Sequence, residues 1–433
     1  MQEQEREQYK NIIISLYNLK MYKDAIHYFE LHKEEFNDLC YYAAVCYDNL
    51  DKKELAIKYY EQSLKYFNDY MIYGNLARLY ADVYIFGERE KQFYYAKKAY
   101  ELNPNDPVNV FNMLLVTCKF NEPAEKYFKE IQKFNPNYSV LFSYGCYLIR
   151  NRNFEDGFKL YRYRIEHDKG ALPDGLHDIW QPNIDISDKT ILVTYEQGFG
   201  DTLMFIRFVE KIKCKELKIL VQDELYDLIS YNYKNVYRAS ERDKIEYDYF
   251  VPMLDVPLLI GLTPETIDQK DGYLKVPGDT IKLETDKFKV GICFAGSKDG
   301  IKTCRDIPLK KLYPLFDLDV QFYLFQKEDI KHEIEDMPDY NVIDLSNHFH
   351  SWLDTAKYMK QMDLMITVDC GVLNLAGSIG VKTWALFNKY PEFRWFYLDK
   401  DIGWYNIKPY QCTEFNGWEE PVKQIKKDLQ KVI

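Results

Sequence analysis

The chain has 433 residues, too many for one compact core, so two or three domains are expected. Hydrophobic residues make up 47% and charged residues 29%, a globular composition that excludes a largely disordered chain. The net charge of −11 argues against nucleic acid as a partner, because an acidic protein repels a phosphate backbone.

The first ten residues, MQEQEREQYK, lack the apolar stretch of a signal peptide, and no run of about 18 apolar residues follows that could span a membrane. Nine cysteines are present, an odd number without a C-x-x-C pair, and several lie in apolar runs, as Cys293 does in VGICF. These features indicate buried free thiols in a reducing compartment, so we expect a cytoplasmic protein without a membrane span.

Residues 1–165 show no strand alternation and are typical of helices of about 10–15 residues. Small residues recur where two helices would cross, as at Ala25 and Ala56, 31 residues apart. Asn-Pro pairs at 103–104 and 135–136 each predict the end of a helix, because proline cannot donate its backbone N–H. Five such units resemble degenerate tetratricopeptide repeats, which are helical hairpins of about 34 residues. A helical bundle without repeats is the alternative.

Residues 166–188 are turn-rich and predict a linker. From residue 189, β-rich runs alternate with helical segments, which indicates parallel α/β sheets. The alternation pauses around residues 262–278 and restarts, so we predict two Rossmann-like lobes, 189–280 and 281–433. The expected strands are 190–195, 217–221, 247–251, 289–294, 320–325, 363–368 and 383–387, and the expected helices include 202–213, 308–316, 351–361 and 419–431. The predicted fold class is an α-solenoid followed by this pair of α/β lobes.

The first candidate site is the sequence YEQGFGDT, which follows a predicted strand and opens a helix. It contains Glu196, Gln197, Gly198 and Gly200, and the two glycines let the backbone turn tightly and approach a ligand. Asp201 falls at the start of the helix. There it either caps the backbone or faces the cleft at the carboxyl end of the strand, where α/β folds bind ligands.

The second candidate site is the sequence GICFAGS, in which a strand runs into a turn. Lys302 and Arg305 follow it, just before a proline-led helix. Backbone N–H groups combined with a lysine or an arginine suit a diphosphate. Lys302 taken alone is more typical of a solvated surface lysine.

The third candidate site is the sequence TVDCGVLNLAGS, where a hydrophobic strand ends at Asp369 and a helix starts near Gly371. The amino end of a helix has N–H groups without partners and a positive dipole end, which favour phosphate. Asp369 is suited to accept hydrogen bonds from sugar hydroxyls, and a helix cap is its alternative role.

In this order, the three turns resemble those of lipopolysaccharide heptosyltransferases. More closely, the chain resembles bacterial tetratricopeptide proteins with a heptosyltransferase-like domain, which are similar in layout to protein O-linked N-acetylglucosamine transferases. The resemblance covers about residues 5–430 and includes NFEDGFKLY from residue 153, Trp180, Arg394-Trp395 and Trp418. It implies a GT-B fold without a metal requirement, with the nucleotide in the C-terminal lobe and the acceptor at the N-terminal lobe.

The resemblance also implies roles for single residues. Asp201 matches the general base that deprotonates the acceptor hydroxyl, with inversion at the anomeric carbon. Arg305 matches the cation that stabilises the departing diphosphate. The other matched positions are Cys370, Gly371 and Val372 at the diphosphate, Asp369 near the sugar and Gln326 near the nucleoside.

One position departs from the family pattern, because Asn374 stands where the family usually has histidine. Asparagine forms hydrogen bonds but holds no proton charge near neutral pH, so a positioning role remains.

The sequence therefore predicts an inverting, metal-independent glycosyltransferase with a nucleotide-sugar co-substrate and no other cofactor. Its acceptor would be a protein or a glycan, and the repeats are expected to recruit it. The alternative is a catalytically inactive scaffold with a degenerate nucleotide-sugar-binding domain. A nucleotide-dependent epimerase is disfavoured, because no full G-x-G-x-x-G fingerprint follows a strand.

Overall fold

The computed structural model describes residues 3–83, 87–168, 170, 172–196, 198–267, 272–278, 283–296, 305–327, 331–395 and 403–433, without the side chains of residues 331 and 332. The chain divides into two compact units, Met1–Tyr144 and Gly145–Ile433. The boundary falls within one helix, so the last helices before the first strand group with the α/β lobes. The domain limits expected at residues 165, 188 and 280 remain predictions.

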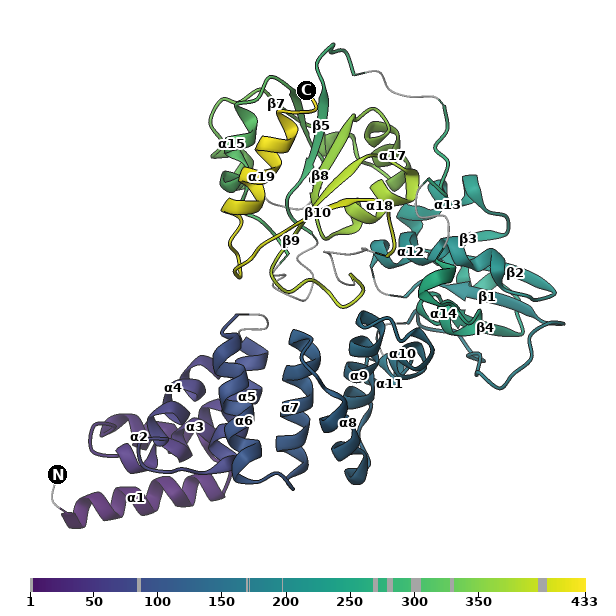
Figure 1. Cartoon of the computed structure of the whole chain (residues 1–433). Coiled ribbons are helices and arrows are strands. Elements are labelled where there is room, and N and C mark those ends of the chain that lie inside the picture. Colours follow the sequence, from purple (N-terminus) through teal and green to yellow (C-terminus); the bar gives the residue numbers. More distant parts are fainter. Residues whose placement is uncertain are drawn as a thin grey trace. The chain divides into compact units, whose positions relative to one another are not determined.

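The helical part forms five consecutive hairpins followed by a short helix (Figure 1). The helices are α1 (Glu3–Asn18), α2 (Tyr22–Leu31), α3 (Cys40–Asn49), α4 (Lys53–Ser63), α5 (Tyr70–Val83), α6 (Arg89–Leu102), α7 (Pro107–Phe120), α8 (Glu125–Ile131), α9 (Tyr138–Arg150), α10 (Phe154–Tyr161) and α11 (Arg164–His167). As predicted, α6 ends just before Asn103-Pro104. A 3₁₀ turn after α8 ends just before Asn135-Pro136.

The repeat is visible in the buried side chains of the hairpins. Ala25 and Ala56, the small residues expected at helix crossings, are fully buried. Glu30 accepts hydrogen bonds from the hydroxyls of Tyr47 (2.8 Å) and Tyr59 (2.7 Å). Glu61, 31 residues further on, does the same for Tyr80 and Tyr95. These glutamates give the tyrosine hydroxyls partners where the hairpins stack, which helps to explain how the array holds so many tyrosines.

The first lobe has a four-stranded parallel sheet with the order β3-β2-β1-β4. Its strands are β1 (Thr190–Thr194), β2 (Glu216–Val221), β3 (Val236–Arg238) and β4 (Tyr249–Pro252). Its α-helices are α12 (Phe199–Phe205), α13 (Tyr226–Asn232) and α14 (Val256–Leu259). A 3₁₀ helix, Ile206–Lys211, continues α12.

The second lobe has a six-stranded parallel sheet with the order β10-β9-β8-β5-β6-β7. Its strands are β5 (Lys289–Cys293), β6 (Gln321–Leu324), β7 (Val342–Asp344), β8 (Leu364–Val368), β9 (Thr383–Phe387) and β10 (Lys408–Gln411). Its helices are α15 (Tyr313–Phe316), α16 (Lys331–Glu335), α17 (Trp352–Met359), α18 (Gly371–Ile379) and α19 (Glu419–Leu429). The predicted α-solenoid with two parallel α/β lobes is confirmed.

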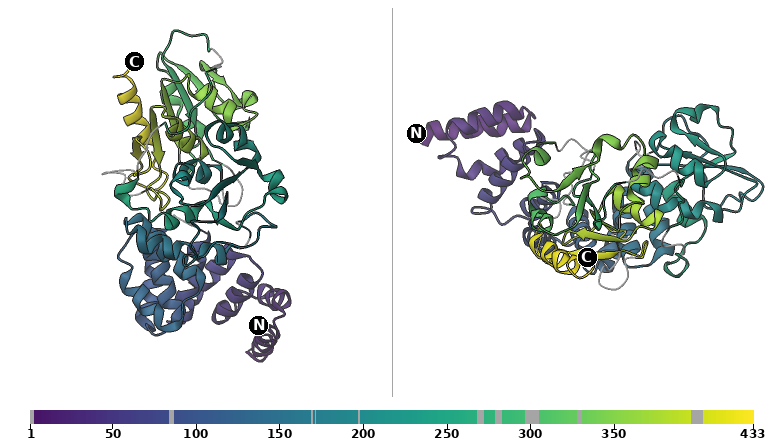
Figure 2. Two further views of the ribbon diagram at one scale, coloured as in Figure 1. Left: turned by 90° about the vertical axis from the view of Figure 1, so that its right-hand side faces the viewer. Right: turned by 90° about the horizontal axis from the view of Figure 1, so that it is seen from above.

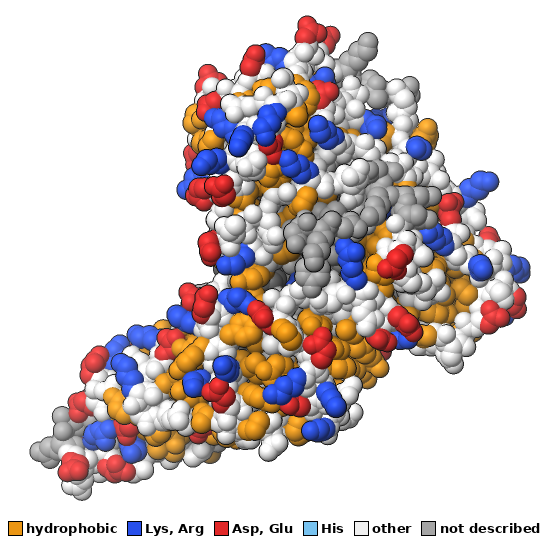
Figure 3. All heavy atoms as spheres, in the orientation of Figure 1, with side chains coloured by type: hydrophobic (Ala, Val, Ile, Leu, Met, Phe, Trp, Pro, Cys, Tyr) orange, Lys and Arg blue, Asp and Glu red, His pale blue; other side chains and the backbone are white. Residues whose placement is uncertain are grey.

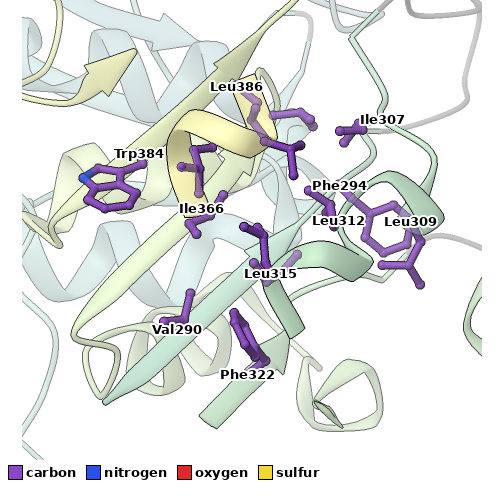
Figure 4. Close-up of a cluster of buried hydrophobic side chains, with 14 of the residues drawn as sticks. Val290, Phe294, Ile307, Leu309, Leu312, Leu315, Phe322, Ile366, Trp384 and Leu386 are labelled. Atoms are coloured by element: carbon purple, nitrogen blue, oxygen red, sulfur yellow. The ribbon is translucent and has the colours of Figure 1, made fainter. Parts of the chain in front are cut away.

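The second lobe is built around a hydrophobic core on one face of its sheet (Figure 4). Alternate residues of β5, among them Val290 and Ile292, pack there with Leu315 of α15 and Ile425 of α19. Helices α17 and α18 lie on the opposite face (Figures 1 and 2). Because strand side chains alternate between faces, Cys293 points toward the side of α18.

A buried ion network ties α11 to the first lobe. Arg164 donates to both carboxylate oxygens of Glu196, at 2.6 and 2.9 Å, and to Asp255 at 2.8 Å. Arg162 also pairs with Asp255, and Leu254 donates its backbone N–H to Glu196. The charged groups of Arg164, Glu196 and Asp255 are almost fully buried, so each depends on the others for compensation.

No helix among the described residues is long and apolar enough to cross a membrane. On the face that Figure 3 shows, basic and acidic side chains are interspersed over both units, so the net negative charge is not gathered in one patch of that face.

We predict that Arg164→Met lowers the free energy of unfolding by about 3–5 kcal/mol, because it removes the arginine that binds Glu196 and leaves Asp255 with Arg162 alone of its two arginine partners. Lys159→Met is the matched control, since the ion pairs of Lys159 within the described part of the chain are with the exposed Glu155 and Asp156. Its effect should be under about 0.5 kcal/mol. Chemical denaturation measures both changes, and equal effects would contradict the prediction.

Candidate functional site

The candidate site lies where the carboxyl ends of β1 and β8 face each other through α12 and α18. Gly200 in the first turn of α12 approaches α18 so closely that a Cβ there would lie 2.7 Å from Asn374 Nδ2. Asn374 is buried, accepts from the Tyr405 hydroxyl at 3.0 Å and donates to the Cys370 carbonyl at 3.1 Å. Gly200 therefore serves close helix packing, and Asn374 has a positioning role between the lobes.

Asp201 caps α12, the first of the two roles that its sequence position suggests, and it also pairs with an arginine of the second lobe. Its Oδ2 accepts a hydrogen bond from the Gly198 N–H at 3.0 Å and so caps α12. Its Oδ1 forms an ion pair with Nη1 of Arg394, which comes from the second lobe. The carboxylate is thus held at the junction of the lobes, next to a cation.

Asp369 directly follows β8, and its side chain is only 7% exposed. None of the described residues hydrogen-bonds its Oδ2, and the nearest cation, Arg305 Nη1, lies 3.8 Å away. Burial raises the pKa of Asp369, and Arg305 opposes this shift. A buried carboxylate oxygen without a partner is costly, which suggests that a ligand hydroxyl completes the arrangement.

Glu392 is a member of the site that the sequence did not reveal. Its carboxylate accepts from the Arg394 backbone N–H at 2.9 Å and from Arg394 Nε at 3.0 Å. Burial, together with the negative charge of Asp369, raises the pKa of Glu392 to about 8. Hydrogen bonds on both sides of Glu392 hold its segment in place. Arg150 donates to the Pro391 carbonyl, and the Trp404 indole N–H donates to the Arg394 carbonyl.

Charged groups of both signs gather in the cluster. It contains the three guanidinium groups of Arg150, Arg305 and Arg394 and the three carboxyls of Asp201, Asp369 and Glu392. Because the pKa of Glu392 is about 8, this carboxyl is largely neutral at pH 7. Asp306 also acts on Arg305, so three carboxylates then accompany three guanidinium groups. Guanidinium groups gathered in this way suit an anionic ligand.

The amino end of α18 adds backbone donors to this cluster. Its N-cap residue, Cys370, provides no side-chain cap that accepts from the helix, and Gly371 and Val372 form the first turn. Gly371 also makes room for the indole of Trp352, since a Cβ there would lie 2.7 Å from the ring. The N–H groups of this turn are suited to bind phosphate oxygens.

Two predicted site residues are engaged within the protein. The side-chain amide of Gln326 binds the turn after β5 through both of its polar atoms. Oε1 accepts from the N–H groups of Phe294 (3.2 Å) and Ala295 (3.1 Å), and Nε2 donates to the Ala295 carbonyl. Glu196 faces Arg164 in the buried network and so anchors the turn before α12. Gln197 and Lys302 lie outside the described residues.

No group of three or more histidine, cysteine, aspartate or glutamate residues suited to a metal ion occurs in the described parts of the chain.

No protein-family model and no curated sequence matches the chain. Similar solved structures include YrrB, a TPR protein with an unusual peptide-binding site, at 17% identity over 37% of this chain and 85% of that one, with a TM-score of 0.33. A family 9 glycosyl transferase from Veillonella parvula shares 14% identity over 58% of this chain and 92% of that one, with a TM-score of 0.41. The iron-containing dodecameric glycosyltransferase TibC from enterotoxigenic E. coli shares 9% identity over 47% and 59%, with a TM-score of 0.36. Sequence identities and TM-scores as low as these do not assign a function to the chain.

We predict that Gly200→Ala destabilises the protein by about 1–3 kcal/mol, because the added methyl group overpacks the contact with Asn374. Gly278→Ala is the control, since nothing lies within 4 Å of its Cβ position. In an Asn374→Ala background the cost of Gly200→Ala should fall, which a double-mutant cycle of unfolding free energies measures. An unchanged cost would show that Asn374 is not the limiting contact.

Proposed function

We propose that the chain is an inverting glycosyltransferase that moves a sugar from a nucleotide-diphosphate donor to a protein or glycan acceptor without a metal ion or another cofactor. The observation that supports this most strongly is the arginine-rich cluster beside the amino end of α18, at the carboxyl ends of both parallel sheets. Ligands of α/β folds bind at this edge, and the guanidinium groups gathered there suit a diphosphate.

In the proposed donor complex, Arg305 and the N–H groups at Cys370, Gly371 and Val372 bind the diphosphate. Asp369 accepts a hydrogen bond from a sugar hydroxyl through its Oδ2, which has no hydrogen-bond partner among the described residues. Lys302 contributes a further cation, and Gln326 lies at the nucleoside end. Asn374 positions the first turn of α18 through its bond to the Cys370 carbonyl.

In the proposed transfer step, Asp201 takes the proton of the acceptor hydroxyl, and the oxygen attacks the anomeric carbon in line with the departing diphosphate. The bond from that carbon to the diphosphate breaks, and its electron pair stays on the phosphate oxygen, where Arg305 stabilises the charge. Arg394, which pairs with Asp201 in this structure, turns to the diphosphate of the bound donor and so frees the base.

The acceptor approaches the turn formed by Glu196, Gln197, Gly198 and Gly200. The helical hairpins recruit it, and a reducing, cytoplasmic setting fits the thiols of the chain. The second candidate function is an inactive scaffold that only binds nucleotide sugars. The ion pair that occupies the Asp201 carboxylate favours this alternative, so turnover has to be measured directly.

We expect native protein to hydrolyse or transfer at least one sugar from a panel of nucleotide sugars, in the presence of EDTA. Asp201→Asn should lower kcat by about 100-fold or more while donor affinity changes little, because general-base catalysis contributes about 10²–10⁴-fold. Asp243→Asn, which alters an exposed carboxylate of the same lobe, is the control. Donor binding without turnover in native protein would favour the scaffold, and neither binding nor turnover would exclude both candidates.

We also expect the affinity for a nucleotide sugar to fall as the pH rises through about 8, where Glu392 loses its proton and its charge opposes the diphosphate. The loss should be about tenfold, as for one added charge some 10 Å away at an effective dielectric constant of about 20. Glu392→Gln should remove most of this dependence. Titration calorimetry below and above this pH measures it, and a pH response that Glu392→Gln retains would assign it to another group.

A further inference from the structure

Two cysteines from different strand ends meet beside the candidate site. Cys293 is the last residue of β5, and Cys370 follows β8, which pairs with β5. Their sulfur atoms lie 3.7 Å apart. The turn after β5 is close as well, since a Cβ on Gly296 would lie 3.4 Å from that of Cys370. A disulfide has a sulfur–sulfur distance of about 2.05 Å, so the two sulfur atoms would have to move closer together by less than about 2 Å to form a bond.

We propose that Cys293 and Cys370 are an oxidation site, a thiol pair that a hydroperoxide converts to a disulfide and that thereby closes the donor side of the site. Cys370 is the attacking thiol because it is partly exposed, and Cys293 is the resolving thiol because it is buried next to it. The disulfide would tie the turn after β5 to the amino end of α18, and its effect on transfer rests on the proposed function.

The electrostatic surroundings set Cys370 apart from other thiols of the chain. A hydrogen bond from the Cys293 thiol lowers the pKa of Cys370. Thr367 and the N–H groups at the start of α18 lower it further, against the opposing effect of burial. Burial instead raises the pKa of Cys40 to about 11 and that of Cys412 to about 12. Because the thiolate is the nucleophile, Cys370 should react first.

The chemistry balances with a hydroperoxide as the oxidant. The Cys370 thiolate attacks one oxygen of hydrogen peroxide, the O–O bond breaks, and the other oxygen leaves as hydroxide. The hydroxide takes up the proton that the thiol had released and becomes water, and Cys370 is left as a sulfenic acid. The Cys293 sulfur then attacks the Cys370 sulfur, the S–S bond forms, and the S–O bond breaks. A second water leaves with the Cys293 proton. Two thiols are oxidised, and one molecule of hydrogen peroxide is reduced to two waters.

The test treats reduced full-length protein with graded hydrogen peroxide, blocks the remaining thiols with an alkylating reagent and maps the peptides by mass spectrometry. We expect one cross-link, between the peptides that contain Cys293 and Cys370, and its reversal by dithiothreitol. Cys370 should be modified about tenfold or more faster than Cys412, in line with its greater thiolate fraction. A cross-link to Cys304 instead, or equal reactivity of Cys370 and Cys412, overturns the proposal.

Two variants separate the steps. Cys293→Ser should leave Cys370 as a sulfenic acid that dimedone traps, whereas Cys412→Ser should keep the native cross-link. In parallel, nucleotide-sugar binding should weaken at least tenfold in the oxidised protein and recover on reduction. A cross-link that leaves nucleotide-sugar binding unchanged overturns the proposal that the disulfide closes the donor side of the site. Reduced protein that binds no donor counts against the proposed function, whereas the cross-link is judged by its own readout.

Discussion

Arg394 is the residue on which the geometry of the site depends, because its guanidinium contacts carboxylates from both lobes. It pairs with Asp201 of α12 and with Glu392 of its own segment, and its carbonyl accepts from the Trp404 indole. A guanidinium presents its donors in a rigid plane, so two carboxylates bound to it are held in a fixed relation. The turn after β1 and the segment after β9 are therefore positioned by one side chain.

A second arginine holds the same turn from the protein interior. Arg164 binds Glu196 just after β1, while Arg394 binds Asp201 five residues later. Ion pairs therefore hold both ends of the turn that carries the proposed base: Glu196 in the buried network with Arg164, and Asp201 at the junction of the lobes with Arg394. This explains why α10 and α11, which continue the helical hairpins in sequence, group with the lobes. Arg164, the first residue of α11, belongs to the buried network of the first lobe.

The sequence was sufficient for the elements with strong patterns. The seven expected strands formed because each run is rich in aliphatic, β-branched or aromatic residues, and the Asn-Pro pairs ended helices as predicted. The strands that were missed are β3, β7 and β10, which are three or four residues long and lie at the edges of their sheets. Such strands exist because a neighbouring strand offers hydrogen bonds, and that neighbour is distant in sequence. Glu392 was missed for the same reason, since its pKa is raised by burial in the folded chain and by the charge of Asp369, which is distant in sequence.

Asn374 illustrates how the structure changes the meaning of a sequence difference. Considered as a missing histidine, it weakens the enzyme interpretation, because an amide cannot carry a proton charge. In the folded chain, however, its side-chain amide accepts from the Tyr405 hydroxyl and donates to the Cys370 carbonyl, and it packs against Gly200. A larger imidazole at this buried contact would require Gly200 and α12 to move away. The difference is thus coupled to the close packing of α12 on α18, and the charged chemistry of the site belongs to Arg305, Arg394 and Glu392 instead.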